Sequence, residues 1–277
     1  MFKKIAIIGL GLMGGSLAAA CREKLPKTRI VGITRNRKAL SFAKKNKWIH
    51  EGSRELRSGV QDADLIVLCT PVDTFPCYLK EIDRFCKKGT LVTDVGSVKA
   101  SIQKEVHKRH WRHLSFVSCH PMVGSHERGI RVSHPALYDD GLMILVRDKR
   151  TCLRSYKKVK QFWSRFSGRI VELSPNMHDK LVGEVSHLPH AIAVCLMHTV
   201  SKPALKLASA GFRDTTRIAA SDPSIWEPIF KANQKFILQD LNRFERTLKI
   251  FKRNLSASNP YPLVRFLDRA KKIRCSI

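Results

Sequence analysis

Short apolar runs alternate with amphipathic stretches through the first 173 residues of the chain. Runs such as residues 5–8 (IAII) are too short for helices, and their uniformly apolar character is typical of strands buried on both faces. The predicted strands are 5–8, 29–33, 64–69, 90–94, 114–117, 142–146 and 169–173, and the predicted helices between them are 13–21, 38–46, 74–85 and 151–166. This alternation predicts a parallel, doubly wound sheet, with 169–173 as its last strand.

The pattern becomes helical from Ser174 onward. Pro175 suits the start of a helix, and an apolar-rich segment then continues to residue 200, with a kink expected at Pro189. A second helical region follows Asp222, which is a good N-cap because Pro223 suits the first helical position. The sequence thus predicts an α/β chain with two parts, a Rossmann-type domain over 1–173 and an all-α domain over 174–277.

Apolar side chains recur at helical spacing in the second helical region and predict a buried face. They are Ile225, Ile229, Phe236, Ile237, Leu241, Phe244, Leu248 and Phe251. Such a face is more typical of a core or a subunit interface than of a ligand site.

The first strand breaks into the motif Gly9-x-Gly11-x-x-Gly14. In a dinucleotide-binding turn the first glycine makes the tight bend, the second admits the pyrophosphate, and the third lets the helix pack on the strand. The free N–H groups at the start of that helix would face the phosphates. We therefore predict a nucleotide site formed by the glycines, by Leu12 and Met13 at the helix start, and by Thr70 and Pro71 after strand 64–69.

The end of the second strand indicates which dinucleotide is bound. An NAD-selective site usually places a carboxylate about 20 residues beyond the glycines to bind the ribose 2′-hydroxyl. Thr34 stands there, followed by Arg35 and, two residues on, Arg37. Guanidinium groups match phosphate oxygens, so we predict NADP as the preferred cofactor, with NAD as the alternative.

Ligands of a doubly wound sheet bind at the carboxyl ends of its strands, so residues that follow strands are candidates for chemistry. Ser97 follows the predicted strand 90–94, and His120 follows the run 114–117. Pro121 restricts His120 to extended geometry. A histidine at the rim of the crevice can take a proton from a substrate hydroxyl while hydride leaves the same carbon. The alternative is a histidine that merely caps a strand end.

Charge is the unusual feature of the composition. The 277 residues carry 51 Lys+Arg against 23 Asp+Glu, a formal net charge of +28. The basic residues are spread over predicted helix surfaces without a zinc-finger or RNP-type pattern, which disfavours specific nucleic-acid binding and favours attraction of anionic small molecules. The eight cysteines are scattered without a CxxC pair, which indicates free thiols of a cytoplasmic protein with no metal site. Apolar runs of strand length predict no membrane span.

Five ordered motifs carry a family resemblance. GLGLMGGSLA, DVGSVK, HPMVG, SHLPHA and GFRDTTRIAASDP, in that order and spacing, resemble the prephenate/arogenate dehydrogenases of tyrosine biosynthesis over residues 3–250. The resemblance implies an NAD(P)-dependent oxidative decarboxylation of prephenate to 4-hydroxyphenylpyruvate, or alternatively of arogenate to tyrosine. It also implies a homodimer formed through the helical domain. Some relatives carry an acidic gating residue near His126, whereas Glu127 stands one residue later here.

The resemblance assigns roles to particular side chains. His120 would bind the substrate hydroxyl and act as base, and Ser97 would hold that hydroxyl and orient the His120 ring. Arg217 would bind the ring carboxylate, a task suited to a bidentate guanidinium. His190 would contact the substrate side chain, and Trp226 would line the pocket.

Two further interpretations stay open at this point. A two-domain β-hydroxyacid dehydrogenase or imine reductase would share the first domain but should use a catalytic lysine or another residue on the helical domain. A nucleotide- or nucleic-acid-binding protein without dehydrogenase activity would account for the net charge. His178 and His187 lie on the same predicted helical segment as His190, and such histidines are often only hydrogen-bonded core or surface residues.

Overall fold

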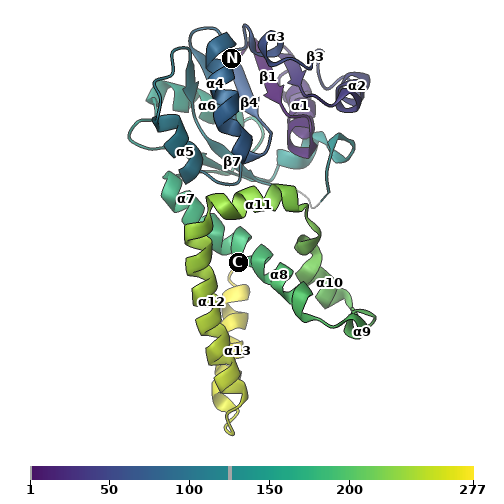
Figure 1. Ribbon diagram of the computed structural model, residues 1–277, viewed down its shortest axis with the longest axis vertical. Helices are drawn as coiled ribbons and strands as arrows, with labels where there is room; N and C mark the ends of the chain where they lie inside the picture. The colour runs from purple at the N-terminus through teal and green to yellow at the C-terminus, as the bar shows by residue number, and fades with distance from the viewer. Residues whose placement is uncertain (1, 124–126) are drawn as a thin grey trace.

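The computed structural model describes residues 2–123 and 127–277. A parallel six-stranded sheet with the order β3-β2-β1-β4-β5-β6 forms the N-terminal half, with helices on both of its faces (Figure 1). The strands are β1 (Lys4–Ile8), β2 (Arg29–Ile33), β3 (Glu51–Ser53), β4 (Leu65–Leu68), β5 (Thr90–Asp94) and β6 (Leu114–Phe116). The predicted Rossmann-type sheet is therefore confirmed.

The helices of this half are α1 (Leu12–Lys24), α2 (Arg37–Lys45), α3 (Leu56–Val60), α4 (Phe75–Phe85), α5 (Ala100–His107) and α6 (Leu153–Trp163), with the 3₁₀ turn η1 (Val72–Thr74) before α4. The central strands β1 and β4 are almost wholly apolar and buried on both faces, which accounts for two separate cores, one on each side of the sheet. The short β3, α3 and α5 were not predicted, because they carry too few residues to show a period.

A second sheet corrects one prediction. Residues 142–146 and 169–173 do not extend the main sheet but form a three-stranded sheet with the order β7-β8-β9. Its strands are β7 (Cys119–Met122), β8 (Leu142–Val146) and β9 (Ile170–Leu173), with β7 antiparallel to β8. Val171 and Glu172 are exposed, as befits an edge strand. An apolar run predicts a strand, but the connections around it decide which strand it pairs with.

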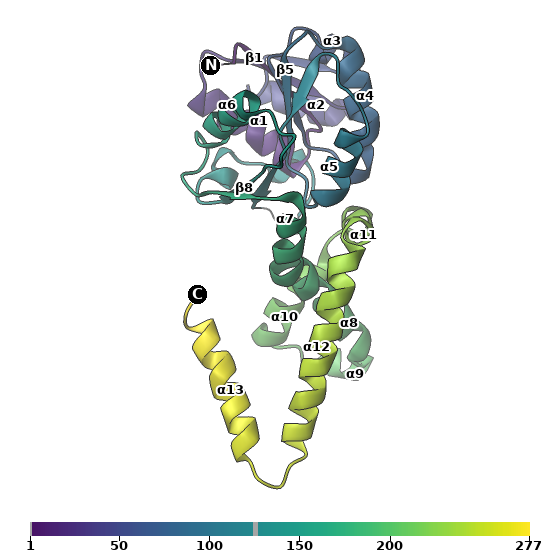
Figure 2. The ribbon, with the colours of Figure 1, turned by 90° about the vertical axis from the view of Figure 1, so that its left-hand side faces the viewer.

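The second half of the chain is helical below the sheets (Figure 2). Its helices are α7 (Pro175–Val182), α8 (Leu188–Thr199), α9 (Lys202–Leu205), α10 (Ala210–Thr216), α11 (Pro223–Ala232), α12 (Gln234–Leu255) and α13 (Tyr261–Arg274), with a 3₁₀ turn η5 (Arg217–Ala220) before α11. A π-helical segment η4 (Gly183–His187) joins α7 to α8. Pro189 lies at the start of α8, where the π-helix gives way to an α-helix. A proline is tolerated there because the first turn of an α-helix does not need its backbone N–H.

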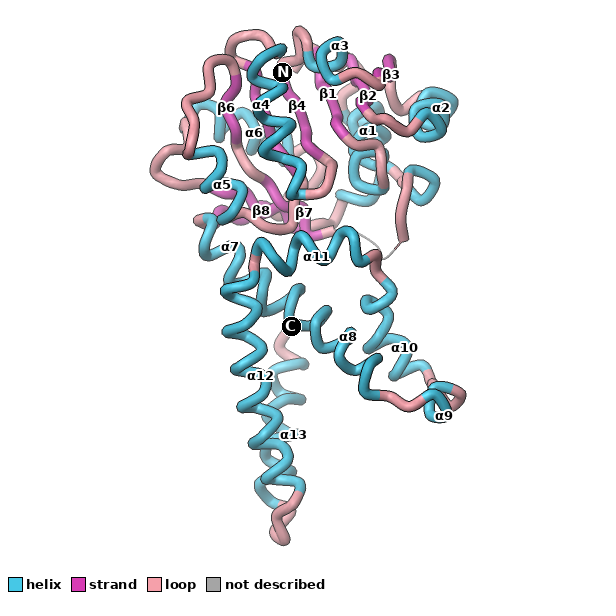
Figure 3. The backbone as a smooth tube through the Cα atoms, in the orientation of Figure 1, coloured by secondary structure: helices cyan, strands magenta, loops and turns pink. Residues whose placement is uncertain are grey.

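The predicted apolar face of the second helical region is only partly covered. Ile229 and Ile237 are buried, whereas Ile225 and Leu248 are exposed. The region is also divided at Asn233 into α11 and α12, and α12 projects with α13 away from the rest of the chain (Figures 2 and 3). Side chains on the projecting part therefore meet little of their own chain.

Asp222 begins α11 as predicted, because its carboxylate accepts a hydrogen bond from the backbone N–H of Ser224 at 2.7 Å. Helix α11 contacts η1, which follows the carboxyl end of β4. The helical half thus lies against the edge of the sheet at which a doubly wound fold binds its ligands. Within residues 2–123 and 127–277, no helix is both long and apolar enough to cross a bilayer.

Candidate active site

The glycine turn between β1 and α1 has the shape that a dinucleotide needs. Gly9 has a φ of +95°, and a Cβ on it would lie 2.6 Å from the carbonyl oxygen of Cys69. A Cβ on Gly14 would lie 1.8 Å from the carbonyl oxygen of Gly9, so only glycine lets the helix approach the turn. By contrast, a Cβ on Gly11 would meet nothing within 4 Å. That open space is where the backbone would admit a pyrophosphate.

The start of α1 is suited to an anion. No side chain caps its N-terminus, and its first turn holds no acidic residue, so its N–H groups and dipole favour a phosphate. The carbonyl oxygens of Leu12 and Met13 accept hydrogen bonds from Ser133 Oγ and Tyr138 Oη, which fixes the turn from behind. These contacts fit a pyridine dinucleotide with its pyrophosphate at Gly11.

Thr70 and Pro71 follow β4, beside the glycine turn. The Thr70 hydroxyl lies 2.8 Å from that of Thr74 in η1, and its methyl group would lie 3.0 Å from a Cβ on Gly9. The two residues thus adjoin the glycines across the carboxyl ends of β1 and β4.

Thr34, Arg35 and Arg37 lie at the carboxyl end of β2, next to β1. Asn36 N donates to Thr34 Oγ1 at 3.3 Å, and Asn36 caps α2 by accepting from Ala39 N at 3.2 Å. Both arginines are exposed, and neither pairs with a carboxylate in the parts of the chain that the structure describes. Two guanidinium groups are thus available at the position where the adenosine ribose binds in this fold.

A buried ion pair fixes the loop that carries Ser97. Asp94, at the end of β5, accepts from Lys99 Nζ at 2.5 Å, and both side chains are fully buried. The same carboxylate accepts from Ser118 Oγ and from Cys119 N, while Lys99 Nζ also donates to the Cys119 carbonyl. The pair therefore joins the 95–99 loop to the backbone just before His120.

His120 lies inside a strand rather than after one, which corrects its predicted placement. A new strand, β7, begins at Cys119, shortly after β6 ends at Phe116. His120 belongs to β7 and lies opposite Ile144 of β8. Its side chain is buried, and its Nδ1 lies 2.9 Å from Nε2 of His178. Burial, followed by the neighbouring His178, Lys99 and His187, lowers the pKa of His120 well below its ordinary value. His120 is therefore held neutral, as a proton acceptor must be.

The resemblance gave Ser97 the task of orienting the His120 ring, but the side chain bonded to its Nδ1 is His178 on α7. His178 Nδ1 lies 2.8 Å from Oδ1 of Asp179. Asp179 in turn accepts from the backbone N–H groups of Lys99 and Ala100 at 2.7 and 2.9 Å. Four residues from both halves of the molecule are thus connected to the candidate base.

A second group of side chains lies alongside. His190 of α8 stacks on Trp226 of α11 with ring centroids 3.6 Å apart, and the His187 ring meets the edge of the same indole at 5.9 Å. Asn233 Nδ2 donates to His187 Nδ1 at 2.9 Å. Burial lowers the pKa of His190, and chiefly burial lowers that of His187 to about 4. Both rings are therefore neutral, and His187 carries its proton on Nε2.

Arg217 is the first residue of η5, which packs against α8, the helix of His190. Its side chain is exposed. His126 lies outside the described residues, and Glu127 is exposed next to them.

Sequence reasoning assigned His178 no role beyond that of a hydrogen-bonded helix residue, and it did not single out Asp179, Asn233, Asp94 or Lys99. An adjacent His-Asp pair at a helix start is the one signal in the sequence that could have indicated a hydrogen-bonded histidine. The described residues hold no group of three or more His, Cys, Asp or Glu side chains that could bind a metal ion.

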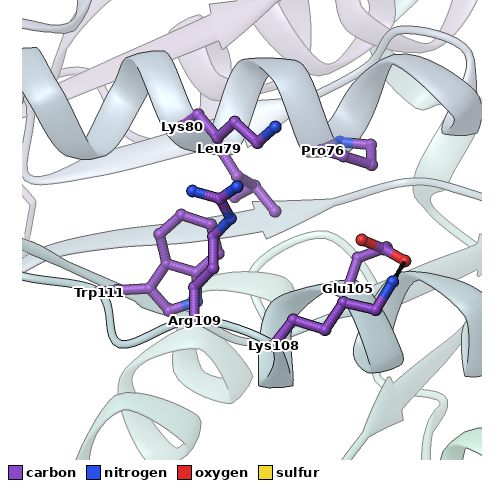
Figure 4. Close-up of a pocket in the computed structure, with 7 residues that line it drawn as sticks. All are labelled: Pro76, Leu79, Lys80, Glu105, Lys108, Arg109 and Trp111. Atoms are coloured by element: carbon purple, nitrogen blue, oxygen red, sulfur yellow. Dashed lines mark hydrogen bonds and ion pairs between the residues drawn. The ribbon is translucent and has the colours of Figure 1, made fainter.

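A separate cavity of about 520 Å³ lies between α4 and the end of α5 (Figure 4). Its lining residues are Pro76, Leu79, Lys80, Glu105, Lys108, Arg109 and Trp111. None of them belongs to the glycine turn or to the histidine groups. The cavity is therefore distinct from the candidate active site.

A glycine turn shaped for a dinucleotide, beside a buried neutral histidine and a helical domain, defines a dehydrogenase that uses a pyridine nucleotide. Comparisons with known proteins identify the family. Residues 17–172 match the family model for the prephenate dehydrogenase nucleotide-binding domain, and residues 174–269 match that for the prephenate dehydrogenase dimerization domain. The chain belongs to the prephenate dehydrogenase family.

Individual members of this family are similar to the chain over most of its length. The chain is 31% identical to the prephenate dehydrogenase of Bacillus subtilis, over 98% of this chain and 75% of that protein. It is similar to the crystal structure of the prephenate dehydrogenase of A. aeolicus in complex with hydroxyphenyl propionate and NAD+, with a TM-score of 0.93 and 32% identity over 100% of this chain and 98% of that one. Synechocystis arogenate dehydrogenase is similar with a TM-score of 0.83 and 26% identity over 99% of each chain.

Proposed function

We propose that this protein oxidises and decarboxylates prephenate to 4-hydroxyphenylpyruvate, with NADP as its preferred cofactor. The observation that carries the proposal is the buried, neutral His120, bonded at Nδ1 to a histidine of the helical half, in a domain that also holds a dinucleotide-shaped turn. A hydroxyl being oxidised needs a base, and a cyclohexadienol becomes aromatic when hydride and CO2 leave it.

In this mechanism the substrate hydroxyl gives its proton to Nε2 of His120. Ser97 holds the same hydroxyl from the loop that the Asp94–Lys99 pair fixes. Hydride leaves the carbon that bears the hydroxyl, the electron pair of the bond to the ring carboxylate passes into the ring as CO2 departs, and His120 returns the proton to the oxygen of the phenol that forms. The bound nicotinamide supplies the hydride acceptor. The low pKa of His120 keeps its lone pair available at neutral pH.

Three side chains of the helical half are assigned to substrate binding. Arg217 binds the ring carboxylate through its guanidinium, and His190 contacts the substrate side chain. Trp226 holds the His190 ring by stacking and closes the pocket with its indole.

The preference for NADP rests on Arg35 and Arg37, which are exposed at the end of β2 and can pair with a 2′-phosphate. No carboxylate occupies position 34 to bind a ribose 2′-hydroxyl. The similar enzyme from A. aeolicus was crystallised with NAD+. The proposed cofactor preference of this protein therefore differs from the cofactor bound in that structure.

Arogenate is the second candidate substrate, because a similar structure is that of an arogenate dehydrogenase. It differs from prephenate in carrying an amino acid in place of a keto acid. The exposed apolar residues Leu248 and Leu255 of α12 and Leu267 of α13 support a homodimer built through these helices. Location in the cytoplasm stays a prediction from the scattered cysteines.

The test is nicotinamide reduction by the purified protein with prephenate or arogenate, each with NADP or NAD. We expect the highest kcat/KM with prephenate and NADP. A higher value with arogenate would reverse the substrate assignment, and a higher value with NAD would reverse the cofactor assignment. No reduction in any combination, with cofactor bound, would overturn the proposed activity and favour a nucleotide-binding role for the basic surface.

A further inference from the structure

The hydrogen bonds around His120 form a chain that ends on a carboxylate. His120 Nδ1 contacts His178 Nε2 at 2.9 Å, and His178 Nδ1 contacts Asp179 Oδ1 at 2.8 Å. All three side chains are buried, with 7, 0 and 1% of their surface exposed. A continuous buried chain of this kind restricts where each proton can lie, because every contact needs one donor and one acceptor.

The direction of the chain follows from Asp179. Its two carboxylate oxygens accept the backbone N–H groups of Lys99 and Ala100, so Asp179 acts as a hydrogen-bond acceptor on both oxygens. His178 must then donate from Nδ1 to Asp179, which leaves Nε2 of the neutral His178 ring as an acceptor. His120 therefore donates from Nδ1, and its own lone pair is on Nε2.

We propose that His178 and Asp179 are positioning residues that hold His120 in its Nε2-lone-pair tautomer and stabilise the positive charge that His120 gains when it takes a proton. This inference deepens the proposed function and rests on it for the identity of the proton donor. The tautomer itself is a property of the protein without substrate, so it can be tested independently.

The charges around His120 explain why a relay is needed. Burial, any positive charge on His178 and the ammonium group of Lys99 disfavour an imidazolium at position 120, and His187 adds no negative charge. Asp94 is already engaged with Lys99 in a fully buried pair. Asp179 is the carboxylate that reaches His120, and it does so only through the His178 ring.

The relay also joins the two halves of the molecule. His120 belongs to β7, whereas His178 and Asp179 belong to α7, the first helix of the helical half. The backbone N–H groups that Asp179 accepts are at the start of α5, and Asn233 Nδ2 donates to the Asp179 carbonyl oxygen. The orientation of the base thus depends on correct docking of the helical half.

The first experiment measures the ring ¹⁵N chemical shifts of His120 in the wild-type protein without substrate. We expect the pattern of a neutral ring protonated at Nδ1, which is the less common tautomer of free histidine. A ring protonated at Nε2 would overturn the proposal, whether or not the protein reduces a nicotinamide cofactor.

The second experiment compares His178→Met with His178→Gln. Methionine fills a similar volume without an acceptor, whereas the glutamine amide oxygen can replace Nε2 as the acceptor of the His120 proton. We expect His178→Met to lower kcat by roughly 10- to 100-fold with KM and the cofactor Kd little changed, and His178→Gln to restore most of the loss. His113→Met, at a part-buried histidine outside the site, is the control and should match the wild type.

The acid limb of the kcat profile gives a further readout. His178, Lys99 and His187 are the titratable groups that face His120, from α7, from the loop after β5 and from η4. Loss of the relay should shift the acid limb to lower pH in His178→Met, since the imidazolium loses its link to Asp179. Equal losses in the Met and Gln variants, or an unshifted profile with wild-type kcat, would contradict the proposal. Inactive wild-type protein with the expected tautomer would instead count only against the proposed reaction.

Discussion

The glycine turn and the histidine relay are built on opposite principles. The turn is one continuous stretch between β1 and α1 whose function depends on missing side chains, since a Cβ on Gly9 or Gly14 would clash with backbone. The relay collects His120, His178 and Asp179 from segments more than 50 residues apart, and its function depends on which side chains are present. A local backbone site can be read from spacing, whereas a side-chain network needs the fold to bring it together.

The two sites also tolerate change differently. At Gly9 and Gly14 of the turn, adding a single methyl group produces steric overlap, and the nearest atoms cannot move aside because they are backbone. In the relay, removing a group leaves buried polar atoms without partners, which costs about 1–3 kcal/mol each. The turn therefore fails by crowding and the relay by loss of hydrogen bonds.

The largest expected effect is on the chemical step at the relay. His120→Asn keeps a donor near the position of Nδ1 but removes Nε2, and we expect kcat to fall by about 10²- to 10⁴-fold, as for loss of a general base. Steady-state kinetics measure the loss, and fluorescence titration should show unchanged cofactor affinity. A turnover equal to the wild type would remove His120 from the mechanism.

The glycine turn offers a matched pair of variants. Gly14→Ala places a Cβ 1.8 Å from a carbonyl oxygen, so we expect the free energy of unfolding to fall by about 3 kcal/mol or more and cofactor binding to be lost. Gly11→Ala has open space and an ordinary φ of −88°, so it should unfold like the wild type yet bind the dinucleotide weakly. Denaturant unfolding and cofactor titration separate the two. Tight cofactor binding by Gly11→Ala would show that the pyrophosphate lies elsewhere.

Cofactor selectivity should respond to Arg35, one of the two exposed arginines at the end of β2. Arg35→Ala removes a charged hydrogen-bond donor to a 2′-phosphate, and we expect NADP affinity to fall by about tenfold or more while NAD affinity stays constant. Lys38→Ala, at an exposed cation nearby on α2, controls for the general loss of positive charge. Equal effects of Arg35→Ala on both cofactors would refute the assignment.

The smallest expected effect is on the free energy of unfolding, which should change little near neutral pH and fall on acidification. His187 is neutral in the folded protein with a pKa lowered to about 4, whereas its unfolded value is about 6.5. Between these values the unfolded chain binds the extra proton, so the free energy of unfolding should fall as the pH drops from about 6.5 to about 4, by up to roughly 3 kcal/mol.

Unfolding by denaturant across this pH range measures the slope. His187→Asn retains an acceptor for Asn233 but does not titrate, so its stability should depend less steeply on pH than that of the wild type. Asp179, His178 and His190 also act on His187, the first raising and the others lowering its pKa. Parallel slopes for the two proteins would show that His187 is not buried in its neutral form.

The sequence by itself determined the α/β class, the glycine turn and the helical second half. These follow from short-range rules: buried strands are uniformly apolar, glycine spacing fixes a turn, and Asp222 with Pro223 begins a helix. It also singled out His120 as a candidate base, although it placed that residue after a strand rather than within β7.

Only the tertiary structure decided which strands pair and which side chains meet. It separated β8 and β9 into a second sheet, paired Asp94 with Lys99, and brought His178 within hydrogen-bond distance of His120. His178 looked like any histidine on a helix, because a one-dimensional pattern records the face on which a residue lies and not what covers that face. Contacts between distant segments depend on how the elements dock, which local propensity does not encode.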